Sequence, residues 1–82
     1  MMKTTDFIGE LYELGFGVSF ELHDVHVVKR GILRKKVARI SLRQAGDQEI
    51  NDRRLRRMKP QVREKLLNLM LDYSNTPIEK RR

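Results

Sequence analysis

The sequence contains no cysteine and no tryptophan, and only two of its 82 residues are histidines. Without cysteine, neither a disulfide framework nor a thiolate metal site is available, and two histidines alone make a poor metal site. No apolar run comes near the roughly 18 residues that a membrane-spanning helix needs. We therefore expect a soluble cytoplasmic protein that is stabilised by packing alone and holds no metal or other cofactor.

Groups that would support catalysis are also scarce. His23 and His26 lie three positions apart, and Asp24 between them has the chemistry to orient one of them as a general base. The sequence offers no cysteine and no elbow-like serine motif as a nucleophile, and its five glycines form no phosphate loop. We therefore predict that the protein is not an enzyme. An active site on these three residues becomes a candidate only if their side chains converge in a pocket.

Positive charge is the most informative property of the sequence. The formal net charge is +7, but residues 1–28 carry one lysine against five acidic residues, a balance of −4. Residues 29–59 carry twelve lysines and arginines against three acidic residues, a balance of +9, and residues 60–82 add +2. Because the excess lies in one stretch, we expect a dipolar molecule whose favoured partner is an anionic polymer.

The hydrophobic pattern predicts one small α+β domain over residues 1–82, in which an antiparallel meander of three or four strands carries both helices on one face. An apolar helical face follows the N-cap hydroxyls of Thr4 and Thr5, and Gly15 suits the helix end. The conformation of residues 51–59 stays open, and we expect the tail to fray from about residue 76. The other expected elements are strands at 17–22, 25–28 and 36–42, a short strand at 48–51, and a helix from Pro60 to Asn75.

A resemblance spans nearly the whole chain. The opening from Phe7 to Phe16, the apolar stretch Leu66–Leu69, and above all Thr76-Pro77-Ile78-Glu79 after the last helix resemble small uncharacterised phage and prophage proteins of Gram-positive bacteria. This resemblance implies a phage-encoded protein in the host cytoplasm, and it carries no established activity. The chain departs from those proteins at residues 53–57, where four arginines replace the aromatic residues that precede their last helix.

Two basic clusters form the candidate binding site for nucleic acid. The first lies around the predicted hairpin after the second strand, and Arg39 extends it along a strand face that we expect to include Val37 and Ser41. The second places arginines on both sides of Leu55, and arginine suits phosphate through its forked donors. The predicted site residues are Lys29, Arg30, Arg34, Lys35, Lys36, Arg39, Arg53, Arg54, Arg56, Arg57 and Lys59.

Several alternatives remain open at this point. The same basic surface also suits an acidic patch on a protein partner, or the charges are a solvated face without a partner. Leu67 and Leu71 widen the apolar stripe of the last helix, so a homodimer through that helix competes with simple packing under the first helix. Because aromatics are few, we expect backbone binding of DNA or RNA with little sequence specificity rather than a stacking platform for single strands.

Overall fold

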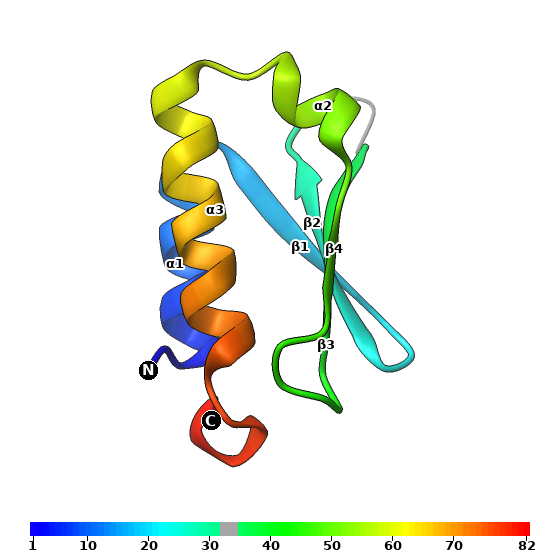
Figure 1. Cartoon of the computed structure of the whole chain (residues 1–82), viewed down its shortest axis with the longest axis vertical. Helices are drawn as coiled ribbons and strands as arrows, with labels where there is room; N and C mark the ends of the chain where they lie inside the picture. Colours follow the sequence, from blue (N-terminus) through cyan, green and yellow to red (C-terminus); the bar gives the residue numbers. More distant parts are fainter. Residues whose placement is uncertain (32–34) are drawn as a thin grey trace.

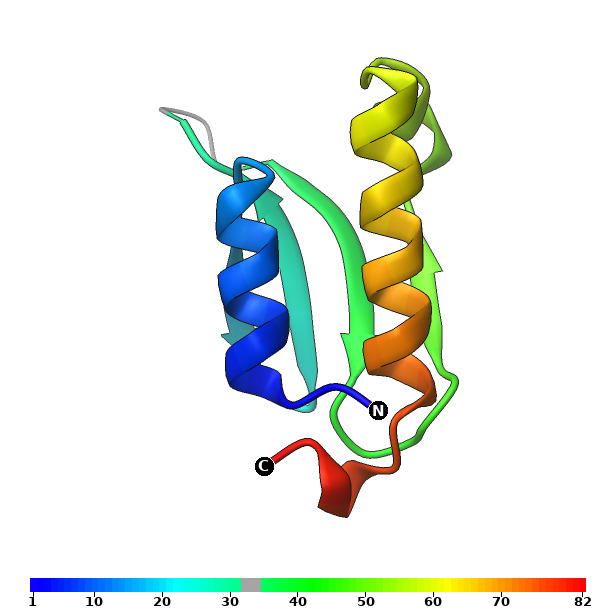
Figure 2. The same ribbon diagram turned by 90° about the vertical axis from the view of Figure 1, so that its left-hand side faces the viewer.

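A computed structural model describes residues 1–31 and 35–82 of the chain. Within that part the strands form one antiparallel sheet in the order β1-β2-β3-β4, and α1 and α3 lie side by side on one face of it (Figures 1 and 2). The predicted α+β meander is thereby confirmed. The elements are α1 (Thr4–Glu13), β1 (Phe16–Glu21), β2 (Asp24–Lys29), β3 (Lys36–Ser41), β4 (Gln48–Ile50), α2 (Asp52–Arg56), α3 (Pro60–Asn75) and the 3-10 helix η1 (Ile78–Lys80).

Helix α1 ends as its sequence predicts and begins differently. Gly15 adopts a φ of 96°, a left-handed conformation that suits glycine at a helix end. At the start, Lys3 is the N-cap and no side chain caps the helix. The Thr4 hydroxyl instead shares a hydrogen bond of 2.8 Å with the Tyr73 hydroxyl, and the Thr4 N–H donates to the Arg81 carbonyl. The C-terminal segment thus provides an acceptor for one of the N–H groups that the first turn of α1 leaves without a partner inside the helix.

The sheet turns its apolar residues toward the helices. Val25 and Val27 of β2 are fully buried and lie opposite Ile40 and Ala38 of β3. The register then shifts, so that Val37 has no partner on β2 and joins the core. The expectation that Val37 shares an outer face with Arg39 is therefore wrong, because strict alternation does not hold across such an irregularity.

Helix α3 supplies the other half of the core. Pro60 stands at its first turn, and Leu66, Met70 and Tyr73 are buried against the sheet and α1. The Tyr73 ring stacks on Phe7 of α1, with centroids 4.2 Å apart and an interplanar angle of 2°. Each such fully buried large side chain contributes about 1.5–3 kcal/mol from apolar burial.

The C-terminal segment is packed rather than frayed, which corrects the expectation for the tail. Arg81 is only 3% exposed, and its guanidinium lies over the Tyr73 ring. Its three nitrogens donate to the carbonyls of Thr76 (3.0 Å), Ser41 (2.8 Å) and Ser74 (2.8 Å). The forked guanidinium thus supplies donors to carbonyls at the ends of α3 and β3, of which the Ser74 carbonyl also accepts from the Gly46 N–H at 2.8 Å.

Candidate nucleic-acid interface

The two basic clusters come together at one end of the molecule, opposite the chain termini (Figure 1). The Lys29 N–H donates to the Lys35 carbonyl at 3.0 Å, which joins the end of β2 to the start of β3. Helix α2 follows β4, the neighbour of β3, and the Asn51 N–H donates to the Val37 carbonyl at 2.9 Å. Sheet topology therefore brings residues 29–35 beside residues 51–59.

Residues 51–59, whose conformation the sequence left open, contain the short helix α2. Asn51 is its N-cap, and its side-chain oxygen accepts from the Arg54 N–H at 3.3 Å. Leu55 is buried and anchors the helix to the core, whereas Arg53 and Arg57 are exposed. A buried leucine flanked by exposed arginines presents positive charge on a fixed backbone, as the sequence predicts.

A groove of about 640 Å³ opens between these elements, and we call it the basic groove. Its apolar lining is buried or half-buried and forms a floor, whereas its cations are exposed except for the half-buried Arg54. The apolar residues are Leu14, Phe16, Val37, Met58 and Val62. The cations are Lys29, Arg30, Lys35, Arg54, Arg57 and Lys59. Glycines 15 and 31 complete the lining.

The charges of the basic groove are not neutralised by neighbours that the structure describes. No aspartate or glutamate of residues 1–31 and 35–82 lines the groove, and none of these residues forms an ion pair with its six cations. A second hollow of about 470 Å³ shares Lys35, Arg54 and Arg57 with it and adds Asn51 and Arg53. An anion entering between these cations relieves their mutual repulsion, so the arrangement favours binding of phosphate or carboxylate groups.

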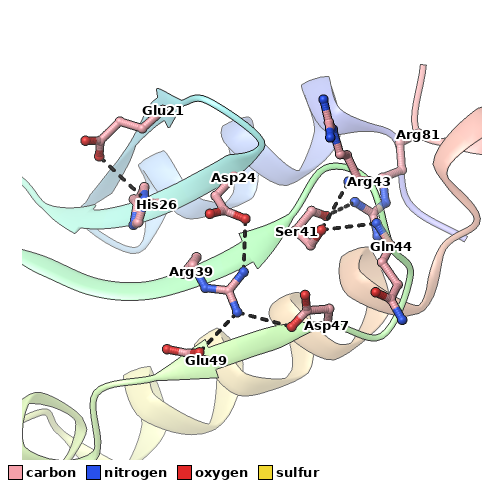
Figure 3. Close-up of polar contacts among 10 residues, drawn as sticks. All are labelled: Glu21, Asp24, His26, Arg39, Ser41, Arg43, Gln44, Asp47, Glu49 and Arg81. Carbon is pink, nitrogen blue, oxygen red and sulfur yellow. Dashed lines mark hydrogen bonds and ion pairs between the residues drawn. The ribbon is translucent and has the colours of Figure 1, made fainter.

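Arg39 belongs to a different environment, on the uncovered face of the sheet (Figure 3). Its guanidinium lies 2.9 Å from Asp24, 3.1 Å from Asp47 and 3.3 Å from Glu49. Hydrogen bonds to Asp24 and Asp47 raise the pKa of Arg39 above its ordinary value. Arg39 is therefore engaged by three carboxylates and does not join the basic groove, in contrast to its place in the predicted site.

The other predicted site residues lie in different environments. Lys36 lies 2.7 Å from Glu21, and this hydrogen bond is the main cause that lowers the pKa of the Glu21 carboxyl. Arg56 is exposed but lines neither basic hollow. Arg34 lies outside the described residues. Of the eleven predicted residues, seven therefore line the two hollows, namely Lys29, Arg30, Lys35, Arg53, Arg54, Arg57 and Lys59.

The histidines and their intervening aspartate do not converge. His23 is exposed in the turn before β2, His26 lies 3.5 Å from Glu21, and Asp24 is bonded to Arg39. None of the three lines either basic hollow. Across the described ranges, no group of three or more histidine, cysteine, aspartate or glutamate side chains is placed to hold a metal ion.

Tyr12, which contacts Arg30 at the edge of the basic groove, is not among the residues predicted from the sequence. Tyr12 is 61% exposed on α1, and the Arg30 guanidinium carbon lies 3.9 Å from the centroid of its ring. The same guanidinium donates to the Tyr12 carbonyl at 3.1 Å. The helical period places Tyr12 away from the apolar face that contains Phe7 and Leu11. This position predicts an exposed aromatic ring, which an arginine can contact through its guanidinium.

Among the helices of the described residues, none combines the length and the apolar content that crossing a membrane requires. Comparison of the chain with protein-family models, with curated proteins and with solved structures gives no match in any of the three. The shape and charge of the basic groove are therefore the observations that bear on its function.

Proposed function

We propose that this chain is a non-catalytic accessory protein of the phage type that it resembles, and that it binds nucleic acid through the basic groove with little sequence specificity. The observation that carries the proposal is the convergence of two separate cationic segments on one groove, without a carboxylate lining it among the described residues. Scattered surface charges that only maintain solubility do not require such a convergence.

The chemistry of the groove suits a phosphate backbone. Arg30, Arg54 and Arg57 carry planar guanidinium groups that donate two parallel hydrogen bonds to a phosphate, and Lys29, Lys35 and Lys59 add point charges. Binding of this kind releases counterions from the nucleic acid, so its affinity falls steeply with salt. Contacts to phosphates position a protein on nucleic acid without reading its sequence, which accounts for the low specificity that we propose.

The test is fluorescence-anisotropy titration of the full chain against labelled single-stranded DNA, duplex DNA and RNA between about 50 and 200 mM salt. Six phosphate contacts predict a loss of affinity across that range on the order of several hundredfold for a single strand and on the order of a thousandfold for a DNA duplex. No binding of any of the three at the low-salt end would overturn the proposal.

A variant pair with matched charge tests the location of the site. R54Q/R57Q removes two groove cations, and K80Q/R82Q removes two exposed cations near the opposite end of the molecule. We expect the first pair to weaken binding about tenfold and to reduce the salt slope by roughly 1.4 on single strands, whereas the second pair changes both only slightly. Polyglutamate of similar charge is the competitor for an acidic protein partner, and tighter binding of polyglutamate than of nucleic acid would replace the proposal with that partner.

A further inference from the structure

The floor of the basic groove is apolar, which a phosphate backbone alone does not require. Leu14, Met58 and Val62 are only half-buried and pack against the core with one side, so part of each is available to a ligand. Phosphates lose hydration on an apolar surface and gain nothing in return. The chemistry of the whole groove therefore fits a ligand with flat apolar parts in its centre and negative charges at its margin.

A nucleic-acid strand with unpaired bases has that distribution. The volume of about 640 Å³ falls within the usual range of small-molecule sites, roughly 300–1,000 Å³, and so suits a nucleotide. In a duplex the base faces are stacked and the phosphates form the outer surface, so a base reaches the floor only after it is extruded at a cost of a few kcal/mol. A single strand presents its bases without that cost.

The Tyr12–Arg30 pair supplies a stacking surface at the margin of the groove. Arg30 lines the groove, and its guanidinium is held in place by the Tyr12 ring at 3.9 Å and by the Tyr12 carbonyl at 3.1 Å. A fixed guanidinium plane is a surface on which unpaired bases stack, and an exposed tyrosine ring is another. The pair therefore offers two flat surfaces next to the groove cations.

From the apolar floor, the cationic margin and the Tyr12–Arg30 pair, we infer that the basic groove binds single-stranded nucleic acid with unpaired bases against Tyr12–Arg30 and the floor. This inference rests on the proposed function and names the ligand. It departs from the expectation, drawn from composition, that no stacking platform is present. Sequence specificity stays low because every base has a π-face.

The experiment uses the full chain and four labelled probes of equal length: a single DNA strand, the same sequence as RNA, its DNA duplex, and an abasic DNA strand that keeps the phosphates and lacks the bases. We expect both base-bearing single strands to bind about five- to tenfold tighter than the abasic strand, because stacking on aromatic and guanidinium groups is worth that much for one base. We also expect the duplex to bind more weakly than either base-bearing single strand.

A charge-preserving variant tests the stacking surface itself. R30K keeps the positive charge and removes the guanidinium plane, and R53K is the matched control on the second hollow. We expect R30K to weaken the base-bearing strands about threefold to tenfold more than it weakens the abasic strand, because the abasic strand loses only the phosphate contact of the guanidinium, while R53K does not distinguish the probes. Both residues are exposed, and circular dichroism verifies that the variants fold.

The outcomes separate the two proposals. If none of the four probes binds at about 50 mM salt, the proposed function fails and the inference fails with it. If the probes bind but the duplex or the abasic strand equals the base-bearing single strands, the proposed function stands and the inference is overturned. An equal loss for R30K on the intact and abasic strands also overturns it.

Discussion

Arginines of this protein lie in two contrasting environments. Arg39 on the uncovered sheet face is surrounded by Asp24, Asp47 and Glu49 within 3.3 Å (Figure 3), whereas Arg54 and Arg57 face a groove that no carboxylate of the described residues lines. All three belong to the same basic stretch of sequence, residues 29–59. The difference shows that the sheet register and the placement of α2 decide which cations are available to a ligand, and that net charge does not.

Arg81 is engaged by the fold more completely than Arg39 is. Arg81 is buried and donates to three backbone carbonyls, and it therefore holds the C-terminal segment to the ends of α3 and β3. Substitution of an arginine that contacts carboxylates or backbone carbonyls should therefore lower the stability of the fold. Substitution of an arginine that lines the basic groove should weaken binding.

The largest effect is expected at Arg81. R81Q removes the guanidinium donors of the buried Ser41 and Thr76 carbonyls, and each such loss costs about 1–3 kcal/mol, so we expect a destabilisation of about 3 kcal/mol. Urea unfolding followed by circular dichroism measures it. R82Q, at the exposed neighbour, is the control and should change the free energy of unfolding by less than about 0.5 kcal/mol. Equal stabilities of the two variants would show that the segment does not depend on Arg81.

Charge reversal in the groove should have the second-largest effect, on binding alone. R54E/R57E places two carboxylates among four cations, and we expect affinity for nucleic acid to fall about a hundredfold, which is about 2.7 kcal/mol. The free energy of unfolding should change by less than about 0.5 kcal/mol, because neither side chain lies in the core. Titration and urea unfolding on the same samples check both statements. A large loss of stability would mean that these arginines are structural.

Substitution of Arg39 should lower stability and leave binding unchanged, and its effect should be smaller than those above. R39Q leaves three carboxylates close together, and its effect is reduced by solvent screening because Asp47 and Glu49 are 44% and 78% exposed. We expect a destabilisation of about 1 kcal/mol in urea unfolding. The loss should shrink in about 1 M salt, where exposed charges are screened. A variant as stable as the parent at low salt would contradict the engagement of Arg39.

The smallest effect concerns pH and the Glu21–Lys36 pair. Because Lys36 lowers the pKa of Glu21, the pair stabilises the fold at pH values above the ordinary glutamate pKa. That contribution is lost as the pH falls through the lowered pKa. Urea midpoints of the parent and of E21Q between about pH 6 and pH 3 should therefore converge at the acid end. A difference that stays constant over this range would show that the pair does not couple to protonation.

Local patterns predict most of this fold and only part of the site. The period-two alternation, Gly15 and Pro60 mark elements through neighbouring residues, and the structure contains those elements. The features that local patterns do not predict at Val37, Arg39 and Arg81 have a common origin in contacts between distant segments. A register shift moves Val37 inward, β4 brings Asp47 and Glu49 to Arg39, and Arg81 reaches back to β3. No local period contains that information.

The basic groove can also be predicted only in part from local patterns. The sequence identifies both cationic segments and the anchoring role of Leu55, because charge runs and a lone leucine are visible locally. It does not show that the segments meet over an apolar floor, since that depends on the order of strands in the sheet. Nor does it show that Arg30 lies on the ring of Tyr12, eighteen residues earlier in the chain.

The most direct test compares two double variants that remove the same charge from the same basic stretch. R54Q/R57Q removes two groove cations, and K36Q/R39Q removes two cations that carboxylates already engage. We predict, in anisotropy titrations at about 50 mM salt, that the first weakens nucleic-acid binding about tenfold and that the second changes it less than about twofold. Equal losses for the two variants would contradict the account, because binding would then follow net charge and not the groove.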